Sequence, residues 1–158
     1  MNKLKFGVIG TSRKEDERRI PIHPEHLVRL PEHIRRQLIF EEGYGTPFGI
    51  TDSEMSEQSG GVATRHELLA DIGNVILAKP VLKDFEELSE GGILWGYPHC
   101  VQQMAHTQAA IDRKQTLIAF EDMFVWGPKG QIGRHTFYKN NEMAGYCAVL
   151  HALQLKRS

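Results

Sequence analysis

The segment NVILAKP, residues 74–80, runs through four consecutive apolar residues into a lysine and a proline. A short apolar run of this kind, rich in β-branched residues, is typical of a buried strand. Proline cannot donate a hydrogen bond to a neighbouring strand, so Pro80 discourages the strand from continuing. The segment therefore predicts a buried strand with the charged side chain of Lys79 at its carboxyl end.

Other segments of the chain repeat this strand pattern and alternate with helical ones. The strand-like segments are residues 4–10, 37–43, 93–99 and 116–125, and the helical ones are residues 23–31, 51–61, 64–73, 82–92 and 100–115. Two of the helical segments open on capping boxes, Thr51 with Glu54 and Thr64 with Glu67. This alternation predicts an α/β fold with a largely parallel sheet and helices on both faces.

Composition and charge exclude several classes of function. The chain has 158 residues, with 19 Lys and Arg against 20 Asp and Glu, so its net charge of −1 gives no electrostatic case for nucleic acid or an anionic membrane. No apolar run approaches the roughly 18 residues of a membrane span, and the N-terminal one is too short for a signal peptide. Cys100 and Cys147 lack metal-type spacing, and His23 and His26 have no further ligand nearby. We expect a cytoplasmic protein with reduced thiols and no metal.

A glycine-rich loop between a strand and a helix invites a dinucleotide interpretation. Gly43, Gly45 and Gly49 are spaced G-x-G-x-x-x-G, which misses the G-x-G-x-x-G fingerprint by one residue. Glu41 and Glu42 precede the loop, and their carboxylates would repel a pyrophosphate. We therefore interpret it as a turn-forming loop and predict no cofactor-binding residues in this chain.

Basic side chains follow three of the predicted strands, where ligands of open α/β sheets bind. Lys79 and His99 come directly after their strands, while Arg18 and Arg19 lie in the extended segment after the first strand. Neighbours in an extended chain point to opposite sides, so one arginine can face inward while the other is solvated. Arginine binds carboxylates through two parallel hydrogen bonds, lysine stabilises a keto oxygen, and histidine transfers protons. Together they suggest a site for a small carboxylate, although each alone is most often a surface group.

The order of the motifs is more specific than any single one. The motifs are ERRIPIHPEHLVRL (17–30), FEEGYGTPFGITDSEM (40–55), NVILAKP (74–80), GGILWGYPHC (91–100) and TLIAFEDM (116–123). In this order they resemble the N-terminal domain of the alanine dehydrogenase and pyridine nucleotide transhydrogenase family, over about residues 5 to 155. The tail YKNNEMAGYCAVLHAL (138–153) is similar to the opine-forming branch, particularly carboxyethyl-ornithine synthase, and the His-Cys pair after the fourth strand is similar to saccharopine dehydrogenase.

The resemblance implies a role for each basic residue. It makes Arg19 the anchor of the substrate carboxylate, with Arg18 as its solvated neighbour. It makes Lys79 a contact of the carboxylate and carbonyl, and His99 an acid–base group. We therefore expect Lys79 and His99 to be catalytic, and Arg19, Lys79 and His99 to bind substrate. Because the transhydrogenases do not use a Lys–His pair in their mechanism, the presence of both favours the dehydrogenases.

The resemblance also implies an organisation of the chain. Residues 1–140 would form a Rossmann-like substrate domain without a dinucleotide fingerprint, and residues 141–158 would begin the long helix that leads to the family's NAD(P)-binding domain. Because the sequence ends at Ser158, we expect NAD(P) to be bound by a domain that this chain lacks. The apolar face formed by Met143, Cys147, Leu150 and Leu153 then predicts a homo-oligomer or a partner chain carrying the cofactor domain.

The expected function is that of a substrate-binding, catalytic domain of an NAD(P)-dependent amino-acid or opine dehydrogenase. Such an enzyme joins a 2-oxo acid such as pyruvate to ammonia or to an amino acid, and we expect little activity from this chain alone. A first alternative is a non-catalytic module or partner subunit that binds a small carboxylate. The nucleotide-binding part of a transhydrogenase ranks last because of Lys79 and His99.

Overall fold

The structure, a computed structural model, describes residues 4–156. It comprises two compact units that meet in sequence between Phe120 and Glu121. The first unit contains the predicted site residues Arg19, Lys79 and His99. The domain boundary expected at residue 140 stays a prediction.

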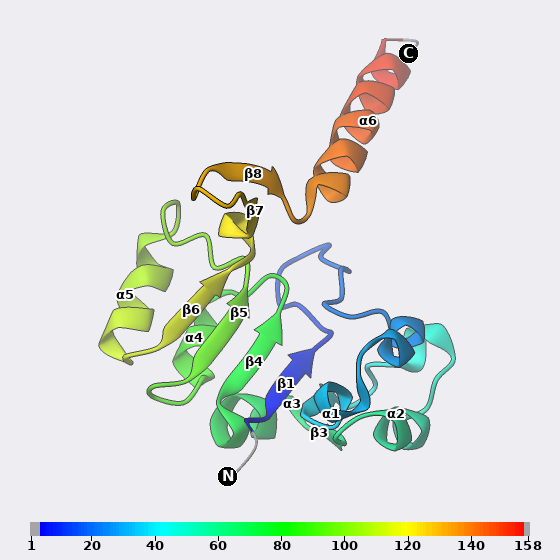
Figure 1. Ribbon diagram of the computed structural model, residues 1–158, viewed down its shortest axis with the longest axis vertical. Helices are drawn as coiled ribbons and strands as arrows, with labels where there is room; N and C mark the ends of the chain where they lie inside the picture. The colour runs from blue at the N-terminus through cyan, green and yellow to red at the C-terminus, as the bar shows by residue number, and fades with distance from the viewer. Residues whose placement is uncertain (1–3, 157–158) are drawn as a thin grey trace. The chain divides into compact units, whose positions relative to one another are not determined.

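The first unit is built on a parallel sheet, as predicted, and the sheet has six strands (Figure 1). Its strands are β1 (Phe6–Ile9), β2 (Leu38–Glu41), β3 (Val62–Ala63), β4 (Asn74–Leu77), β5 (Ile93–Gly96) and β6 (Thr116–Ala119). In the sheet they follow the order β3-β2-β1-β4-β5-β6. The chain therefore moves from β1 toward one edge and then returns to build the other half from β4 onward. The order reverses between β1 and β4, which pair directly with Val8 opposite Ile76.

Short helical segments connect the strands. They are η1 (Pro24–Arg29), α1 (Glu32–Arg35), η2 (Thr46–Phe48), α2 (Asp52–Gln58), α3 (Arg65–Glu67), η3 (Leu68–Ile72), α4 (Leu82–Glu87), α5 (Met104–Asp112) and η4 (Phe120–Asp122). Both predicted capping boxes are confirmed, at the starts of α2 and α3. In each box a threonine hydroxyl accepts from a backbone N–H while a glutamate returns to the threonine N–H, so two donors at the helix start are satisfied.

Apolar side chains form a core on each face of the sheet, which confirms the expected helices on both faces. One core joins the strands to η3, α4 and α5 and consists of Ile9, Ile39, Leu68, Leu69, Val75, Leu77, Phe85, Leu88, Leu94 and Ala110. The other joins them to η1 and α2 and consists of Val8, Leu27, Leu38, Phe40, Tyr44, Met55 and Ile76. Successive strand residues alternate between the two cores because side chains alternate across a strand.

Two features of the strands differ from the sequence prediction. Strand β3 was not predicted, because two residues are too few to show a pattern. The fifth predicted strand, residues 116–125, is too long, because β6 ends at Ala119 and the chain then forms η4. In the second unit, β7 (Phe124–Trp126) pairs antiparallel with β8 (Ile132–His135).

The second unit ends in the helix α6 (Tyr138–Leu155), which begins three residues before the predicted residue 141. Met143, Leu150 and Leu153 are exposed on it. Their role in self-association or in binding a partner stays a prediction. Within residues 4–156, no helix is both long and apolar enough to cross a membrane.

Candidate active site

Lys79 and His99 meet at the carboxyl ends of two neighbouring strands. Lys79 lies in the bend after β4 and His99 follows β5, and the lysine Nζ lies 2.6 Å from the imidazole Nε2. Both groups are basic, so a hydrogen bond between them requires one nitrogen to accept through a lone pair. In this contact one nitrogen carries the shared hydrogen and the other accepts it through a lone pair. Two bases arranged in this way can pass a proton between them.

Tyr97 supports this pair from one side. Its ring lies 4.4 Å from the lysine Nζ, at cation–π distance. The same ring stacks on the imidazole of His99, with 6.0 Å between centroids and planes 24° apart. Tyr97 precedes His99 by two residues, a spacing that keeps side chains on one face of an extended chain. That spacing is the sequence signal for Tyr97, which the sequence prediction missed as a site residue.

Two backbone features bring Lys79 and His99 together. Gly96, the last residue of β5, lies so close to β4 that a Cβ there would meet the carbonyl oxygen of Leu77 at 1.9 Å. Only glycine permits this approach of the two strands. His99 has a φ of 51°, in the left-handed region that costs a residue other than glycine roughly 1 kcal/mol or more. A strained backbone conformation of this kind is found disproportionately at functional sites.

Arg19 is paired with Glu17, which the sequence prediction missed. The Arg19 Nε donates to Glu17 Oε1 over 2.8 Å, the Arg19 backbone N–H donates to the same oxygen, and Nη2 donates to Oε2. The guanidinium stays half exposed, with 51% of the side-chain surface accessible, while Glu17 is largely covered. The sequence signal for this pair is the spacing of two residues between Glu17 and Arg19, which places both side chains on one side of an extended segment.

Electrostatics link this pair to the Lys79 site. The hydrogen bond from Arg19, helped by the charges of Arg19 and Lys79, lowers the pKa of Glu17 from 4.5 to about 2. The bond to Glu17 in turn raises the pKa of Arg19, and Tyr97 contributes to that shift. Arg19 is therefore held by a carboxylate within the electrostatic reach of Lys79, and both Arg18 and Arg19 are exposed.

The site lies at the point where the strand order reverses. The segment carrying Arg19 follows β1 and Lys79 follows β4, and these two strands mark the reversal. In Figure 1, the loop after β1 runs over the carboxyl ends of the strands. Open α/β sheets bind their ligands in the crevice at this switch point. The topology therefore brings the predicted residues to the usual binding edge of the sheet.

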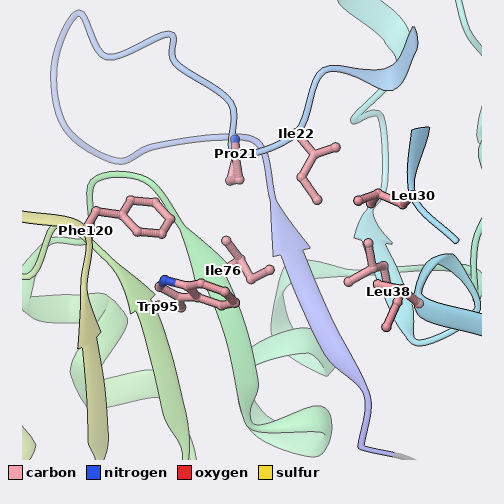
Figure 2. Close-up of a pocket in the computed structure, with 8 residues that line it drawn as sticks. Pro21, Ile22, Leu30, Leu38, Ile76, Trp95 and Phe120 are labelled. Atoms are coloured by element: carbon pink, nitrogen blue, oxygen red, sulfur yellow. The ribbon is translucent and has the colours of Figure 1, made fainter. Parts of the chain in front are cut away.

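An apolar cavity of about 280 Å³ lies over the face of the sheet that carries Leu38, Ile76 and Trp95 (Figure 2). It is lined by Pro21, Ile22, Leu30, Ile34, Leu38, Ile76, Trp95 and Phe120. Phe120 also packs edge-to-face on Tyr97, with 5.2 Å between the ring centroids. One aromatic ring thus separates the cavity from the ring that lies under Lys79. The lining offers no charged group, so a carboxylate is better suited to Lys79 and Arg19.

Two loops that could bind a dinucleotide pyrophosphate already bind carboxylates. The backbone N–H groups after β1, where a Rossmann fold binds pyrophosphate, donate instead to Glu41 Oε2, at 3.0 Å from Gly10 and 2.9 Å from Thr11. At the glycine-rich loop, the Gly43 N–H donates to the carboxylate of Asp52. Both sets of donors already bind carboxylates, which would repel a phosphate. Among residues 4–156, no three His, Cys, Asp or Glu side chains gather as metal ligands.

Comparisons with curated proteins find relatives that are about twice as long. N(5)-(carboxyethyl)ornithine synthase from Lactococcus lactis subsp. lactis is 28% identical, over 95% of this chain and 49% of that protein. The corresponding synthase from Clostridium botulinum is 27% identical, over 85% of this chain and 47% of that protein. Alanine dehydrogenase from Lysinibacillus sphaericus is 32% identical, over 68% of this chain and 29% of that protein. The chain thus spans about half the length of the synthases.

Solved structures share the fold at low identity. An L-alanine dehydrogenase matches 80% of this chain with a TM-score of 0.61 at 17% identity. A transhydrogenase from Sinorhizobium meliloti matches 75% of the chain with the same TM-score and identity. The family model described as "Alanine dehydrogenase/PNT, N-terminal domain" matches residues 8–126, which include nearly the whole parallel sheet and the Lys79 site. The chain therefore belongs to the family of alanine dehydrogenase and PNT N-terminal domains.

Proposed function

We propose that this chain forms the substrate-binding, proton-transferring part of an NAD(P)-dependent oxidoreductase that joins a 2-oxo acid, such as pyruvate, to an amine. The observation that supports this most is the 2.6 Å contact between Lys79 Nζ and His99 Nε2 at the switch point of the sheet. The relatives favour an amino acid as the amine, since the synthases match most of this chain. Ammonia, as expected of an alanine dehydrogenase, is the other candidate.

The chain's own residues suit the steps before reduction. An amine that condenses with a keto group forms an imine, and the carbonyl oxygen leaves as water after it has been protonated. Lys79 would hold the carbonyl oxygen, and His99 would relay the proton to the departing hydroxyl. Arg19 would bind the substrate carboxylate with its paired N–H groups, exchanging Glu17 for the ligand. NAD(P)H is the reductant of this class of reaction, and the N–H groups after β1, which donate to Glu41, are poorly suited to bind its pyrophosphate.

The second candidate is a non-catalytic module that binds the same small carboxylate. The chain spans only about half of each synthase, 49% in one case. A protein that corresponds to half of an enzyme can bind a ligand without turning it over, so we keep this alternative. The non-catalytic module would use Arg19, Lys79 and His99 as the enzyme does, and it would differ from the enzyme only in having no turnover. The nucleotide-binding part of a transhydrogenase is less well supported, because Glu41 already binds the N–H groups that a pyrophosphate would need.

Calorimetric titration of the chain with pyruvate tests the site. Removing Lys79 or Arg19 with alanine deletes a charge-assisted hydrogen bond, so we expect binding roughly ten to a hundred times weaker. Arg18→Ala is the matched control for Arg19→Ala, and Lys114→Ala serves for Lys79, because Lys114 is exposed and pairs with Glu90. Folded Lys79→Ala and Arg19→Ala variants that bind pyruvate like the wild type would contradict the proposed site.

Turnover is tested with NAD(P)H, pyruvate and either ammonia or ornithine, with and without a candidate chain that binds the cofactor. Mass spectrometry would detect the N-carboxyethyl amino acid or alanine. Product that disappears with His99→Asn supports the enzyme, since asparagine tolerates the left-handed backbone conformation of His99. Pyruvate binding without product under every combination favours the non-catalytic module.

A further inference from the structure

A buried cluster of charged residues lies next to the candidate active site and takes no part in the proposed chemistry. At its centre is Asp84, in α4, whose side chain is fully buried. Its Oδ1 accepts from Arg13 Nη1 at 2.7 Å and from Arg65 Nη2 at 2.8 Å. Its Oδ2 accepts from the backbone N–H of Val81 at 2.8 Å, at the start of α4. One carboxylate thus joins three separate segments of the chain.

Arg65 extends the cluster to the ends of two more strands. Its Nη1 donates to the carbonyl oxygen of Thr11 at 2.7 Å and to Glu41 Oε1 at 3.2 Å. Because Glu41 is the last residue of β2 and Thr11 follows β1, Arg65 ties both strand ends to Asp84. The segment that leaves β1 toward Arg19 is therefore held at its beginning.

The same contacts hold the bend that carries Lys79. The hydroxyl of Ser12, next to Thr11, donates to the Lys79 carbonyl oxygen at 2.9 Å. On one side of Lys79, the Ala78 carbonyl accepts from the Tyr97 backbone N–H at 3.1 Å. On the other side, Val81 donates to Asp84. The backbone around Lys79 is thus fixed on both sides. One of the three bonds ends on Asp84, and the Ser12 bond comes from the residue that follows Thr11, whose carbonyl oxygen Arg65 binds.

Stability alone is a weak explanation for this arrangement. Burying charged groups costs desolvation free energy that mutual attraction often only offsets, so apolar residues can serve equally well in a core. What this cluster adds, with every oxygen of Asp84 and Glu41 hydrogen-bonded, is a single geometry. We propose that Asp84 and Arg65 are positioning residues, which hold Ser12 and the bend of residues 78–81 so that the Lys79 amine meets the imidazole of His99.

The inference rests on the proposed function, which supplies pyruvate as the ligand. Its main test, however, needs no ligand. In protein labelled with ¹⁵N-histidine, NMR reports the ring nitrogens of His99 directly. Arg65→Met keeps both carboxylates hydrogen-bonded, because Asp84 retains Arg13 and Val81, and Glu41 retains Gly10 and Thr11. Ser12→Ala removes only the link to Lys79 and a bond from the Lys14 N–H. We expect both variants to move the His99 ring signals and to weaken pyruvate binding roughly tenfold.

Arg36→Met is the matched control. Arg36 donates to the carbonyl oxygens of Glu57 and Ser59 before β2 and β3, at the amino-terminal edge of the sheet. Its loss should affect stability while leaving the His99 signals and pyruvate binding unchanged. Unchanged His99 signals in folded Arg65→Met and Ser12→Ala would overturn the inference, and if Arg65→Met does not fold, Ser12→Ala decides alone. A wild type that does not bind pyruvate would contradict the proposed function, while the His99 signals would still decide the positioning role.

Discussion

The Asp84 cluster and the Lys79–His99 pair lie at the same end of the sheet and follow opposite rules. In the cluster, Arg13 and Arg65 share one buried carboxylate, and every ion pair at that carboxylate joins opposite charges. In the pair, two basic groups lie 2.6 Å apart on the ring of Tyr97. The first contact joins opposite charges, whereas the second joins two nitrogen bases.

In our proposals, the cluster holds the backbone of the site in place and the pair binds the ligand. A carboxylate between two arginines is satisfied in the folded protein and gains nothing from a ligand. We propose instead that the amine and the imidazole at the switch point bind an anionic ligand with a carbonyl oxygen. Substitutions in the cluster should therefore affect folding first, and substitutions in the pair should affect binding first.

The largest effect on stability is expected from Asp84→Ala. It removes the fully buried carboxylate that Arg13 and Arg65 share, so we expect the free energy of unfolding to fall by about 3–5 kcal/mol. Urea denaturation followed by circular dichroism measures this loss. Glu87→Gln is the control, because it removes the other, partly exposed partner of Arg13 and should cost no more than about 1 kcal/mol. Equal losses in the two variants would contradict the distinction.

Gly96→Ala should have the next largest effect. A Cβ at this position would meet the Leu77 carbonyl oxygen at 1.9 Å, so β4 and β5 must move apart at a cost of about 1–3 kcal/mol. We expect the His99 ring signals to change in the same variant, because the two strands carry the pair. Gly145→Ala in α6, where a Cβ meets nothing within 4 Å, should instead stabilise its helix by about 0.5–1 kcal/mol.

Lys79→Met should change stability far less than Asp84→Ala. Methionine keeps much of the apolar stem of lysine and removes a charge that lies beside another base, so we expect a change within about 0.5 kcal/mol. Pyruvate binding should nevertheless fall as it does in Lys79→Ala. Thermal denaturation and calorimetric titration of the same preparation would show both results. A loss of several kcal/mol would mean that Lys79 is structural, like the cluster.

The smallest effect is a dependence on pH carried by Glu17. Its pKa is about 2 in the folded protein against 4.5 ordinarily, so its stabilising contribution is complete above about pH 4.5 and is lost as the pH falls toward 2. Because Arg19 is half exposed, we expect a contribution of no more than about 1 kcal/mol. The stability difference between wild type and Glu17→Gln should shrink from pH 6 to pH 3. If the stability difference between the two proteins stays constant with pH, the ionisation of Glu17 does not contribute to stability.

Local patterns in the amino-acid sequence are enough to predict much of this protein. Apolar runs ended by glycine or proline predict the main strands, and threonine–glutamate spacing predicts two helix starts that the structure confirms. Lys79 and His99 are identified at strand ends, and the structure brings them into contact. Their catalytic role, and the role of Arg19, stay predictions. These features depend on residues close in the chain, whose periodicity is visible in the sequence.

The order of the strands, and with it which strand ends are neighbours, follows from the tertiary structure alone. Asp84 meets Arg13 across 71 positions of the chain, and Ser12 meets Lys79 across 67. Glu41 takes the N–H groups of Gly10 and Thr11, about 30 positions away. No local pattern records such contacts, because they arise when strands distant in sequence pair within one sheet. The sequence thus specifies which residues stand at the strand ends, whereas the assembled sheet specifies which of them lie together at the switch point and which hold the others in place.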